Sequence, residues 1–281
     1  MRRIWTAIAL LMALTTVCGC GSAADSNGIC RYELPATAPG EKLITYSGYS
    51  DIRYGDDAEM ISDPQKIAYT VSYDSDHRIP RWVAYDLTAE ELRGRASRDG
   101  KSFRPDERAG VPQADNYDYR RSGWTRGHLA PAGDFRWSDN ALDNTFYYTN
   151  CCPQTEYFNG TSWEELESRV RYWAKRFGTV YVVTGPIIGD EENGKLGQNR
   201  ISIPDAFFKA LLVRDGNSFQ AIAFVMHNTS DPQPYTRCAM SVDQLEEATG
   251  LDLFCALDDV VENQVEANYS AIFWGLTSVQ A

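Results

Sequence analysis

Two strand-forming segments joined by a short turn place the strongest constraint on the fold of this chain. Segments 206–214 and 219–227 are rich in aliphatic and aromatic residues. Between them, Asp215-Gly216-Asn217 consists of residues that accept the positive φ values of a tight hairpin turn. We therefore expect an antiparallel hairpin that gives a sheet two long neighbouring strands.

Three further segments have strand patterns, and their order in the chain indicates the fold class. Segments 69–73 and 82–87 are strand-like, and the β-branched run 179–184 ends at Gly185-Pro186. A helix is expected from Ser241, with Gln244 completing a capping box, to Gly250. Strands and helices do not follow the regular βαβ order, so we expect an α+β fold, with a central mixed or antiparallel sheet flanked by helices.

Residues 162–177 are expected to form a second, amphipathic helix. Apolar residues recur there at spacings of three and four, which marks one buried face; they are Trp163, Leu166, Val170, Trp173 and Phe177. Thr161 or Ser162 is expected to cap the N-terminus of this helix, and Gly178 to end it.

The first 19 residues have the pattern of an export signal. Arg2 and Arg3 precede an apolar run of 14 residues, 4–17, which is too short to span a membrane as a mature helix. The sequence Val-Cys-Gly-Cys ending at Cys20 resembles a bacterial lipoprotein cleavage site, with ordinary secretion as the alternative. We expect a signal peptide at 1–19, a lipidated or flexible tether at 20–40 and one domain at 41–281. The expected location is the outer membrane or cell surface as a lipoprotein, and otherwise the periplasm or the medium.

Cysteines and charges limit the classes of site. Removal of Cys18 and Cys20 leaves an odd number of cysteines, and in an exported chain a disulfide between Cys238 and Cys255 is our first choice. No Cys-x-x-Cys pair or Cys/His cluster points to structural zinc. The net charge of −12 counts against a nucleic-acid partner. However, segment 237–266 holds eight acids and one arginine, whereas basic residues gather near 120–136 and 169–176, so a basic cleft on an acidic body fits the composition.

Two groups of polar residues are candidates for chemistry. His128 follows Gly127, which permits close backbone approach, and its imidazole titrates near neutral pH; a lone histidine is, on type alone, more often structural. Asn159 lies just before the 162–177 helix, and Glu167 and Arg171 border its apolar face. The alternatives are a turn at Asn159 and a surface ion pair between Glu167 and Arg171.

The segment Arg126-Gly127-His128-Leu129-Ala130-Pro131 resembles the Asp-Arg-Gly-His signature of the DNA/RNA non-specific endonucleases. These are the ββα-metal (His-Me finger) nucleases, which include secreted bacterial nucleases and mitochondrial endonuclease G. Four more blocks, 149–154, 158–159, 163–167 and 184–186, are similar in order and spacing. The resemblance covers roughly residues 65–275. It implies a ββα-metal active-site motif and metal-dependent hydrolysis of phosphodiester bonds in DNA and RNA, without sequence specificity.

The resemblance also implies roles for individual residues. His128 is similar to the general base that activates water, and Asn159 to the one side chain that holds the metal, Mg²⁺, with Mn²⁺ or another divalent ion as alternatives. Glu167 matches the carboxylate that orients the metal's water and assists protonation of the leaving group. Arg126 and Arg171 match the arginines that bind the phosphate. These residue types suit the chemistry, because Mg²⁺ prefers hard oxygen ligands and keeps several waters.

Two supporting positions match the family pattern and two depart from it. Asn150 and Gln154 are similar to residues that hold the cluster in place. Thr125 stands where the family has aspartate, which puts metal affinity or the pH optimum in question. An upstream arginine of the family, a ligand of the substrate phosphate, is matched by Lys101, with Arg98 or Arg104 as alternatives; lysine offers a point charge where arginine offers a bidentate fork.

Other functions remain open at this stage. The first alternative is a catalytically silent envelope lipoprotein that binds nucleic acid or another partner on a nuclease fold. A metal phosphodiesterase for a small substrate is a third hypothesis. Expected partners are DNA and RNA as substrates, the membrane only through a lipid on Cys20, and a second copy of the chain in a homodimer.

Overall fold

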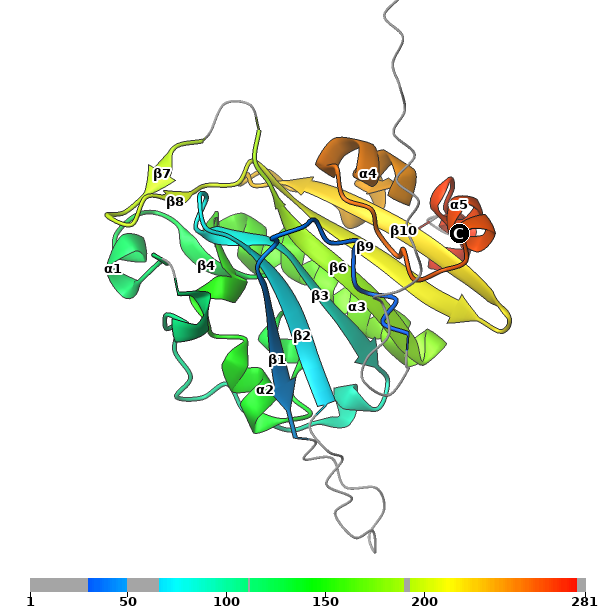
Figure 1. Cartoon of the computed structure of the whole chain (residues 1–281), viewed down its shortest axis with the longest axis horizontal. Helices are drawn as coiled ribbons and strands as arrows, with labels where there is room; N and C mark the ends of the chain where they lie inside the picture. The colour runs from blue at the N-terminus through cyan, green and yellow to red at the C-terminus, as the bar shows by residue number, and fades with distance from the viewer. Residues whose placement is uncertain (1–29, 50–65, 111, 190–192, 277–281) are drawn as a thin grey trace, which may run out of the picture.

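The computed structural model describes residues 30–49, 66–110, 112–189 and 193–276. Residues 1–20, with the expected signal peptide and Cys20, lie outside this part. An antiparallel seven-stranded sheet crosses the molecule in the order β1-β2-β3-β6-β9-β10-β11 (Figure 1). Its strands are β1 Leu43–Gly48, β2 Lys66–Asp74, β3 Ile79–Thr88, β6 Thr179–Ile187, β9 Ala206–Asp215, β10 Ser218–His227 and β11 Ala239–Met240.

The predicted hairpin forms the β9–β10 pair. Ser218 pairs with Asp215, and the register continues to His227 opposite Ala206. Gly216 has a φ of 60°, in the left-handed region that the tight turn requires. The strands expected at 69–73, 82–87 and 179–184 lie within β2, β3 and β6.

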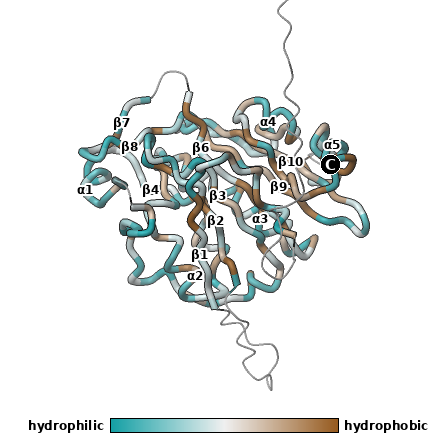
Figure 2. The backbone as a smooth tube through the Cα atoms, in the orientation of Figure 1, coloured by the Kyte–Doolittle hydropathy of each residue, from teal (hydrophilic) through white to brown (hydrophobic). Residues whose placement is uncertain are grey.

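Each face of the sheet packs against its own apolar core. Along β3, Val83 and Tyr85 belong to one core, and Trp82 and Ala84 to the other, because successive side chains of a strand point to opposite faces. Apolar residues accordingly concentrate along the strands (Figure 2). Helix α3 (Trp163–Phe177) covers the first core, and helices α4 (Val242–Thr249) and α5 (Asp259–Glu266) lie over the second (Figure 1). This arrangement confirms the α+β class.

Short elements complete the described chain. They are the helices α1 Asn116–Tyr119, α2 Asp139–Asn144 and α6 Ala271–Trp274, the strand pairs β4 Thr125–His128 with β5 Cys151–Gln154 and β7 Lys195–Leu196 with β8 Ile201–Ser202, the 3₁₀ turns at 91–93, 107–109, 132–134, 148–150 and 235–237, and the π turn η5 Phe158–Ser162. None of the helices in the described ranges has the length and apolar content needed to cross a membrane.

The two long predicted helices begin differently from each other. Ser241 and Gln244 form the expected capping box of α4, and Gly250 ends it in the left-handed region. The predicted cap of α3 at Thr161 or Ser162 is wrong, because Ser162 has helical φ and ψ values and makes no capping bond. The chain instead enters α3 through η5, so the first amide groups of α3 continue a helical path and need no side-chain cap. Gly178 follows α3, as expected.

The disulfide prediction is also wrong, because no bond joins the sulfur atoms of Cys238 and Cys255. The Cys238 thiol donates a hydrogen bond to the Pro234 carbonyl oxygen, and the Cys255 thiol donates one to the Leu34 carbonyl oxygen, each with a sulfur–oxygen distance of 3.6 Å. The disulfide was expected only because an exported chain meets oxidising conditions. A disulfide also requires the two Cα atoms to lie within about 7 Å, which spacing along the sequence does not ensure.

Part of the stretch predicted as a tether at 20–40 packs on the domain. The ring of Tyr32 contacts the rings of Tyr181 and Phe219, at centroid distances of 5.3 and 5.4 Å. The backbone N–H of Ala36 donates to the Asp252 carbonyl oxygen at 2.8 Å. Tyr32 and Ala36, within the expected tether, therefore contact the folded domain.

Candidate active site

Strands β4 and β5 with helix α3 form a compact ββα unit against the sheet. In the antiparallel β4–β5 pair, Thr125 faces Gln154 and His128 faces Cys151. The chain leaves β5, turns through η5 and enters α3. Within this unit, His128 ends β4, Asn159 lies in η5 and Glu167 lies on α3.

Gly127 is required by the close packing between the two strands. A Cβ atom at this position would overlap the side chain of Gln154. Gln154 is fully buried, and neither its amide nitrogen nor its amide oxygen has a hydrogen-bond partner among the described residues. Because unpartnered buried amides are rare and costly, Gln154 indicates a polar site beside Gly127.

His128 is held between aromatic rings with one nitrogen unsatisfied. The ring centroids of Phe103 and Phe146 lie 4.7 and 5.0 Å from that of the imidazole. Nε2 is buried and has no hydrogen-bond partner in the described ranges. Burial, together with the charge of Arg98, lowers the pKa of His128 from 6.5 to about 3. The imidazole is therefore neutral at physiological pH and can accept a proton.

Asn159 is oriented by Thr125. The Asn159 amide nitrogen donates to Thr125 Oγ1 at 3.0 Å, and this hydroxyl donates its own hydrogen to the Gln154 carbonyl oxygen, also at 3.0 Å. With its hydrogen so engaged, the hydroxyl can only accept from Asn159. The amide oxygen of Asn159, which has no hydrogen-bond partner in the described ranges, is thereby left to bind another group.

Asn150 secures the segment that follows His128. Its amide oxygen accepts from the Ala130 N–H at 2.8 Å, and its amide nitrogen donates to the carbonyl oxygens of Ala130 and Thr145, both at 2.9 Å. All three residues are buried. Asn150 thus fixes the backbone just after His128 by bonds to Ala130 and Thr145.

Arg171 pairs with Asp134 rather than with Glu167. One guanidinium nitrogen donates to Asp134 Oδ1 at 3.0 Å, and Asp134 also accepts from the Tyr85 hydroxyl at 2.9 Å. Another nitrogen donates to Ser168 Oγ at 2.8 Å. Asp134 is 1% exposed, and its sequence position just after the signature motif did not reveal this role.

Glu167 lies beside this ion pair and next to a buried lysine. Burial raises the pKa of Glu167, the positive charge of Lys209 opposes that shift, and Asp134 adds to it. Lys209 comes from strand β9, has no exposed surface, and its Nζ has no hydrogen-bond partner in the described ranges. Nζ lies 4.7 Å from the centroid of a Trp163 ring. In the sequence, Lys209 could have been noticed as a lysine inside an apolar strand, since lysine is almost never fully buried without a partner.

Arg126 lies at the opposite border of the unit. Its Nε donates to the Tyr148 hydroxyl and a terminal nitrogen donates to the Asn116 carbonyl oxygen, both at 3.2 Å. Its guanidinium lies 4.9 Å from the ring centroid of Tyr119. Arg126 faces no acidic group in these contacts, so its charge is available to an anion.

The three alternatives for the upstream arginine occupy different surroundings. Lys101 forms an ion pair with Asp139 at 2.9 Å, and Arg104 with Asp143 at 2.6 Å, both on α2. Arg98 forms none of the ion pairs between described residues, and its charge reaches His128. These surroundings favour Arg98 over Lys101 and Arg104 as the phosphate-facing residue.

A hollow of about 290 Å³ opens next to this arginine. Its lining includes Arg98, Arg136 and Gly133, and none of the described residues that line it is an acid. A Cβ atom on Gly133 would lie 3.2 Å from a guanidinium nitrogen of Arg171, so the hollow ends near the Arg171–Asp134 pair. Of the basic residues that the charge distribution singled out, only Arg136 lines this hollow.

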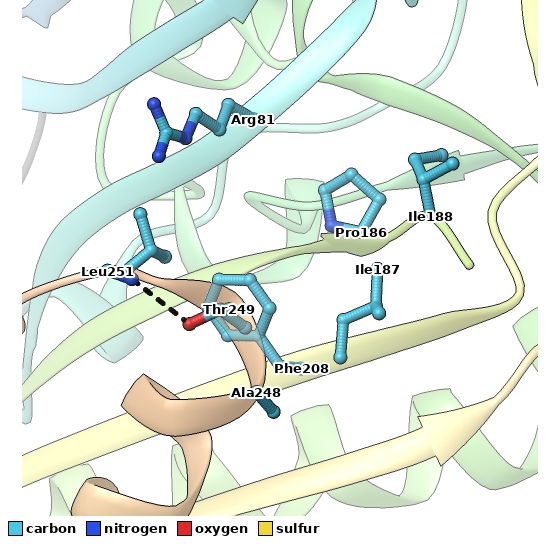
Figure 3. A pocket seen from close by; sticks show the side chains of 8 residues that line it. All are labelled: Arg81, Pro186, Ile187, Ile188, Phe208, Ala248, Thr249 and Leu251. Carbon is cyan, nitrogen blue, oxygen red and sulfur yellow. Dashed lines mark hydrogen bonds between the residues drawn. The ribbon is translucent and has the colours of Figure 1, made fainter. Parts of the chain in front are cut away.

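A second hollow, of about 120 Å³, lies elsewhere and contains none of the candidate residues. It is bounded by Arg81 of β3, by apolar residues in or next to β6 and β9, and by the end of α4, where the Leu251 N–H donates to Thr249 Oγ1 at 3.4 Å (Figure 3). Phe208 in its lining belongs to the core beneath α4 and α5, so this hollow is on the other face of the sheet from α3.

The residues of the unit fit a hydrated divalent cation. Such ions need hard oxygen donors, and Mg²⁺ keeps most of its waters. The amide oxygen of Asn159 is one donor, and Glu167 belongs to none of the ion pairs between described residues. The unpartnered Gln154 amide is a further group able to bond a coordinated water. The donor set suits one protein ligand with water-mediated support around it.

Comparisons with known proteins agree with this geometry. A family model described as DNA/RNA non-specific endonuclease matches residues 54–260. Nuclease EXOG of Danio rerio mitochondria is 37% identical over 206 residues, which is 67% of this chain and 60% of that protein. Mitochondrial endonuclease G of Homo sapiens is 36% identical over 197 residues, covering 66% of each chain. Nuclease C1 of Cunninghamella echinulata var. echinulata is 33% identical, covering 74% of this chain and 89% of that one.

A solved structure is similar as well. The crystal structure of the EndoG/EndoGI complex, which concerns the mechanism of EndoG inhibition, matches with a TM-score of 0.64 and 31% identity, over 69% of this chain and 85% of that chain. The chain spans slightly less than two thirds of the length of the mitochondrial relatives named above.

Proposed function

Because the chain belongs to the DNA/RNA non-specific endonuclease family, we propose that it hydrolyses phosphodiester bonds in DNA and RNA without sequence preference. One observation carries this proposal: His128 Nε2 is buried and unpartnered among the described residues, in an imidazole that stays neutral. A neutral imidazole can take a proton from a reacting water molecule, and the negative charge of a bound phosphate would raise its pKa from this low value toward neutral pH.

His128 acts as the general base of the hydrolysis. It removes a proton from water as the water oxygen bonds to phosphorus, and the bond from phosphorus to the leaving oxygen breaks. Glu167, whose pKa is raised by burial, supplies a proton to that leaving oxygen. Arg171, Arg126 and Arg98 stabilise the negative charge that develops on the phosphate. Arg171 is fixed for this role by its bonds to Asp134 and Ser168.

Asn159 holds the metal ion in this proposal, through the amide oxygen that Thr125 leaves available. A bound Mg²⁺ would supply positive charge near the leaving oxygen. Thr125 contributes a hydroxyl where a carboxylate is expected in the family, so the amide keeps its orientation while the site carries one negative charge less. We therefore expect a weaker hold on the metal rather than a loss of it.

The substrate is expected to lie along the basic hollow. The hollow lined by Arg98 and Arg136 leads toward Arg171, and a polynucleotide backbone lying along it would meet positive groups in sequence. Lys101 and Arg104 are held by ion pairs with Asp139 and Asp143. Their contribution to phosphate binding is accordingly smaller than that of Arg98.

Export is part of the proposal and rests on the sequence of residues 1–20. The basic start, short apolar run and Cys20 support removal of a signal peptide and lipid attachment at the cell surface. Cell fractionation of the wild-type chain and of Cys20→Ser tests this. The membrane-bound fraction should fall in the variant, and equal membrane retention of both would count against lipidation.

The activity is tested with supercoiled plasmid and total RNA, in Mg²⁺ and in EDTA, with the wild-type protein and His128→Ala. Degradation of both polymers in Mg²⁺ only, with loss in His128→Ala, is expected. A control, His227→Ala, changes an exposed histidine at the end of β10 and should leave the rate unchanged. Absence of cleavage across several divalent ions by folded protein would favour the silent binding protein, and cleavage of a small diester alone would favour a phosphodiesterase.

A further inference from the structure

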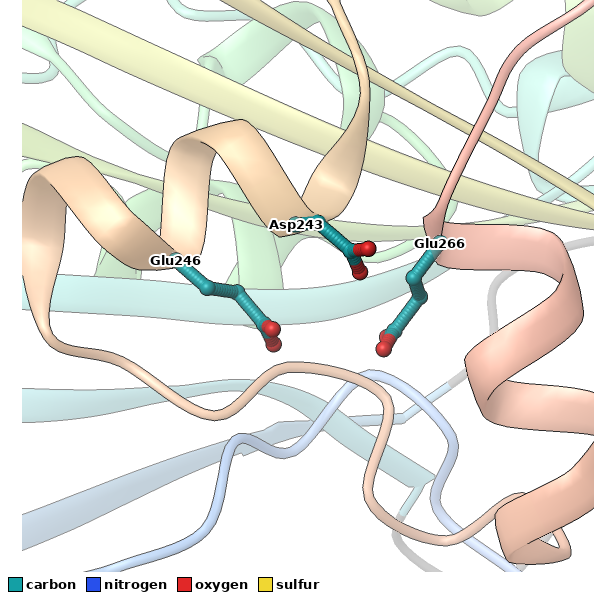
Figure 4. Close-up of side chains that lie close together, drawn as sticks. All are labelled: Asp243, Glu246 and Glu266. Carbon is teal, nitrogen blue, oxygen red and sulfur yellow. The ribbon is translucent and has the colours of Figure 1, made fainter. Parts of the chain in front are cut away.

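Three carboxylates converge on the face of the sheet opposite to α3. Asp243 and Glu246 lie one turn apart on α4, and Glu266 lies at the end of α5. One carboxylate oxygen from each lies within 4.8 Å of the other two. All three side chains point toward a common space between the two helices (Figure 4).

Glu266 is buried without a partner inside this group. The residue is 4% exposed, and Oε1 has no hydrogen-bond partner among the described residues. Burial, together with the nearby carboxylates of Glu246, Glu262 and Asp243, raises its pKa to about 10. A buried acid that meets other acids costs free energy unless a proton or a cation neutralises it.

The surroundings of the group add negative charge rather than positive charge. Burial, with neighbouring acids, raises the pKa of Glu246 and of Glu262 to about 7 each. Five acids gather here, and none takes part in an ion pair between described residues; they are Asp243, Glu246, Asp252, Glu262 and Glu266. Among the described residues, these acids therefore have no cationic partner, on a chain of net charge −12.

We propose that Asp243, Glu246 and Glu266 bind one divalent cation, Ca²⁺ in preference to Mg²⁺, that ties α4 to α5. Ca²⁺ takes six to eight oxygens at about 2.3–2.6 Å, so two of its ligand atoms are at most about 5 Å apart. The spacing of the three oxygens meets this limit. Carboxylates from two separate helices form a flexible set that suits Ca²⁺ better than the strict octahedron of Mg²⁺.

The position of the cluster explains what the ion would do. Glu246 Oε1 accepts from the Leu253 N–H at 2.6 Å, which fixes the loop after α4 to the same carboxylate. Glu266 closes the far side of the cluster, whereas Asp243 is exposed and leaves one side open to water. A cation here would join α4, this loop and α5 over the second core, so it is a stabilising site separate from the candidate active site.

Calorimetric titration of the full chain with CaCl₂, alongside thermal unfolding, tests the proposal. We expect one bound Ca²⁺ and a rise in Tm of roughly 5 to 10 °C at about a hundred times Kd. Glu266→Gln should lose the rise in Tm and melt no lower than wild type without calcium, because the neutral amide resembles the buried, protonated acid but lacks the carboxylate that the ion needs. Glu247→Gln, which removes an exposed charge from the same helix, should behave as wild type.

Two further variants keep the proposal falsifiable. Asp243→Asn changes an exposed residue that does not threaten folding, and it should weaken calcium binding about tenfold or more. Asn159→Ala removes the proposed ligand in the candidate active site and should leave the calcium-dependent rise in Tm intact. The proposal is overturned if wild type binds no Ca²⁺, if Glu266→Gln and Asp243→Asn keep the full effect, or if Asn159→Ala abolishes it.

Discussion

The Asn159 amide nitrogen, in η5, donates to Thr125 Oγ1, at the start of β4, at 3.0 Å. Thr125 stands where the resemblance to the family leads one to expect aspartate, yet it supplies the hydrogen-bond acceptor that orients the amide. What the threonine lacks is the negative charge. The departure in sequence therefore changes the electrostatics of the metal site more than its geometry.

Replacement of Thr125 separates these two effects. Thr125→Val removes the acceptor, at a cost of about 1 kcal/mol in orientation, and should raise the Mg²⁺ concentration for half-maximal activity several-fold. Thr125→Asp restores both acceptor and charge and should lower that concentration below the wild-type value. Metal-dependent plasmid cleavage measures both, with Thr249→Val on α4 as a control. Equal metal requirements in all variants would show that Thr125 does not act on the metal.

His128 and Asn159 should fail in different ways when each is changed to alanine. His128→Ala loses the base and should slow cleavage by about 10² to 10⁴-fold, with metal affinity kept. Asn159→Ala loses the ligand, so metal binding and rate should fall together. Titration calorimetry with Mn²⁺, beside cleavage rates, distinguishes the two. Loss of metal binding in His128→Ala would contradict the assignment.

The Arg171–Asp134 pair has a structural and a chemical role that a double variant can separate. Arg171→Met leaves Asp134 buried and unpaired, and should lower the free energy of unfolding by about 3 kcal/mol. Adding Asp134→Asn should recover most of that stability but not the cleavage rate, because the guanidinium is still missing. Urea unfolding and rate assays measure the two quantities, with the exposed Lys175→Met as control. Recovery of the rate in the double variant would limit Arg171 to a structural role.

The low pKa of His128 predicts how stability depends on pH. The folded value of about 3 lies below the ordinary 6.5, so the unfolded chain binds the proton more readily between these values. Above pH 6.5, His128 is neutral in both the folded and the unfolded chain and does not lower the free energy of unfolding. As the pH falls from 6.5 toward 3, the unfolded chain takes up a proton that the folded chain does not, so the free energy of unfolding decreases. Urea midpoints from about pH 7 to about pH 4 should fall less steeply for His128→Asn than for wild type or His227→Asn. Parallel curves for all three would contradict the assignment.

Local sequence patterns determined several elements of the fold. The β9–β10 hairpin follows from its strand residues and the Asp215-Gly216-Asn217 turn, because turn chemistry and side-chain alternation act over a few residues. The capping box of α4 is equally local. The start of α3 was not predictable in this way, since the π turn η5 depends on how β5 and α3 are joined in space.

The residues of the candidate site also fall into a group that the sequence indicated and a group that only the structure revealed. From the sequence, His128, Asn159, Glu167, Arg126 and Arg171 were singled out through the resemblance of short motifs to those of the endonuclease family. Only the tertiary structure showed that Asp134 pairs with Arg171, that Lys209 lies buried next to Glu167, and that Glu266 meets Asp243 and Glu246. These groups come from elements far apart in the chain, and the energies of buried charges depend on burial and on neighbours brought together by packing, which no local pattern records.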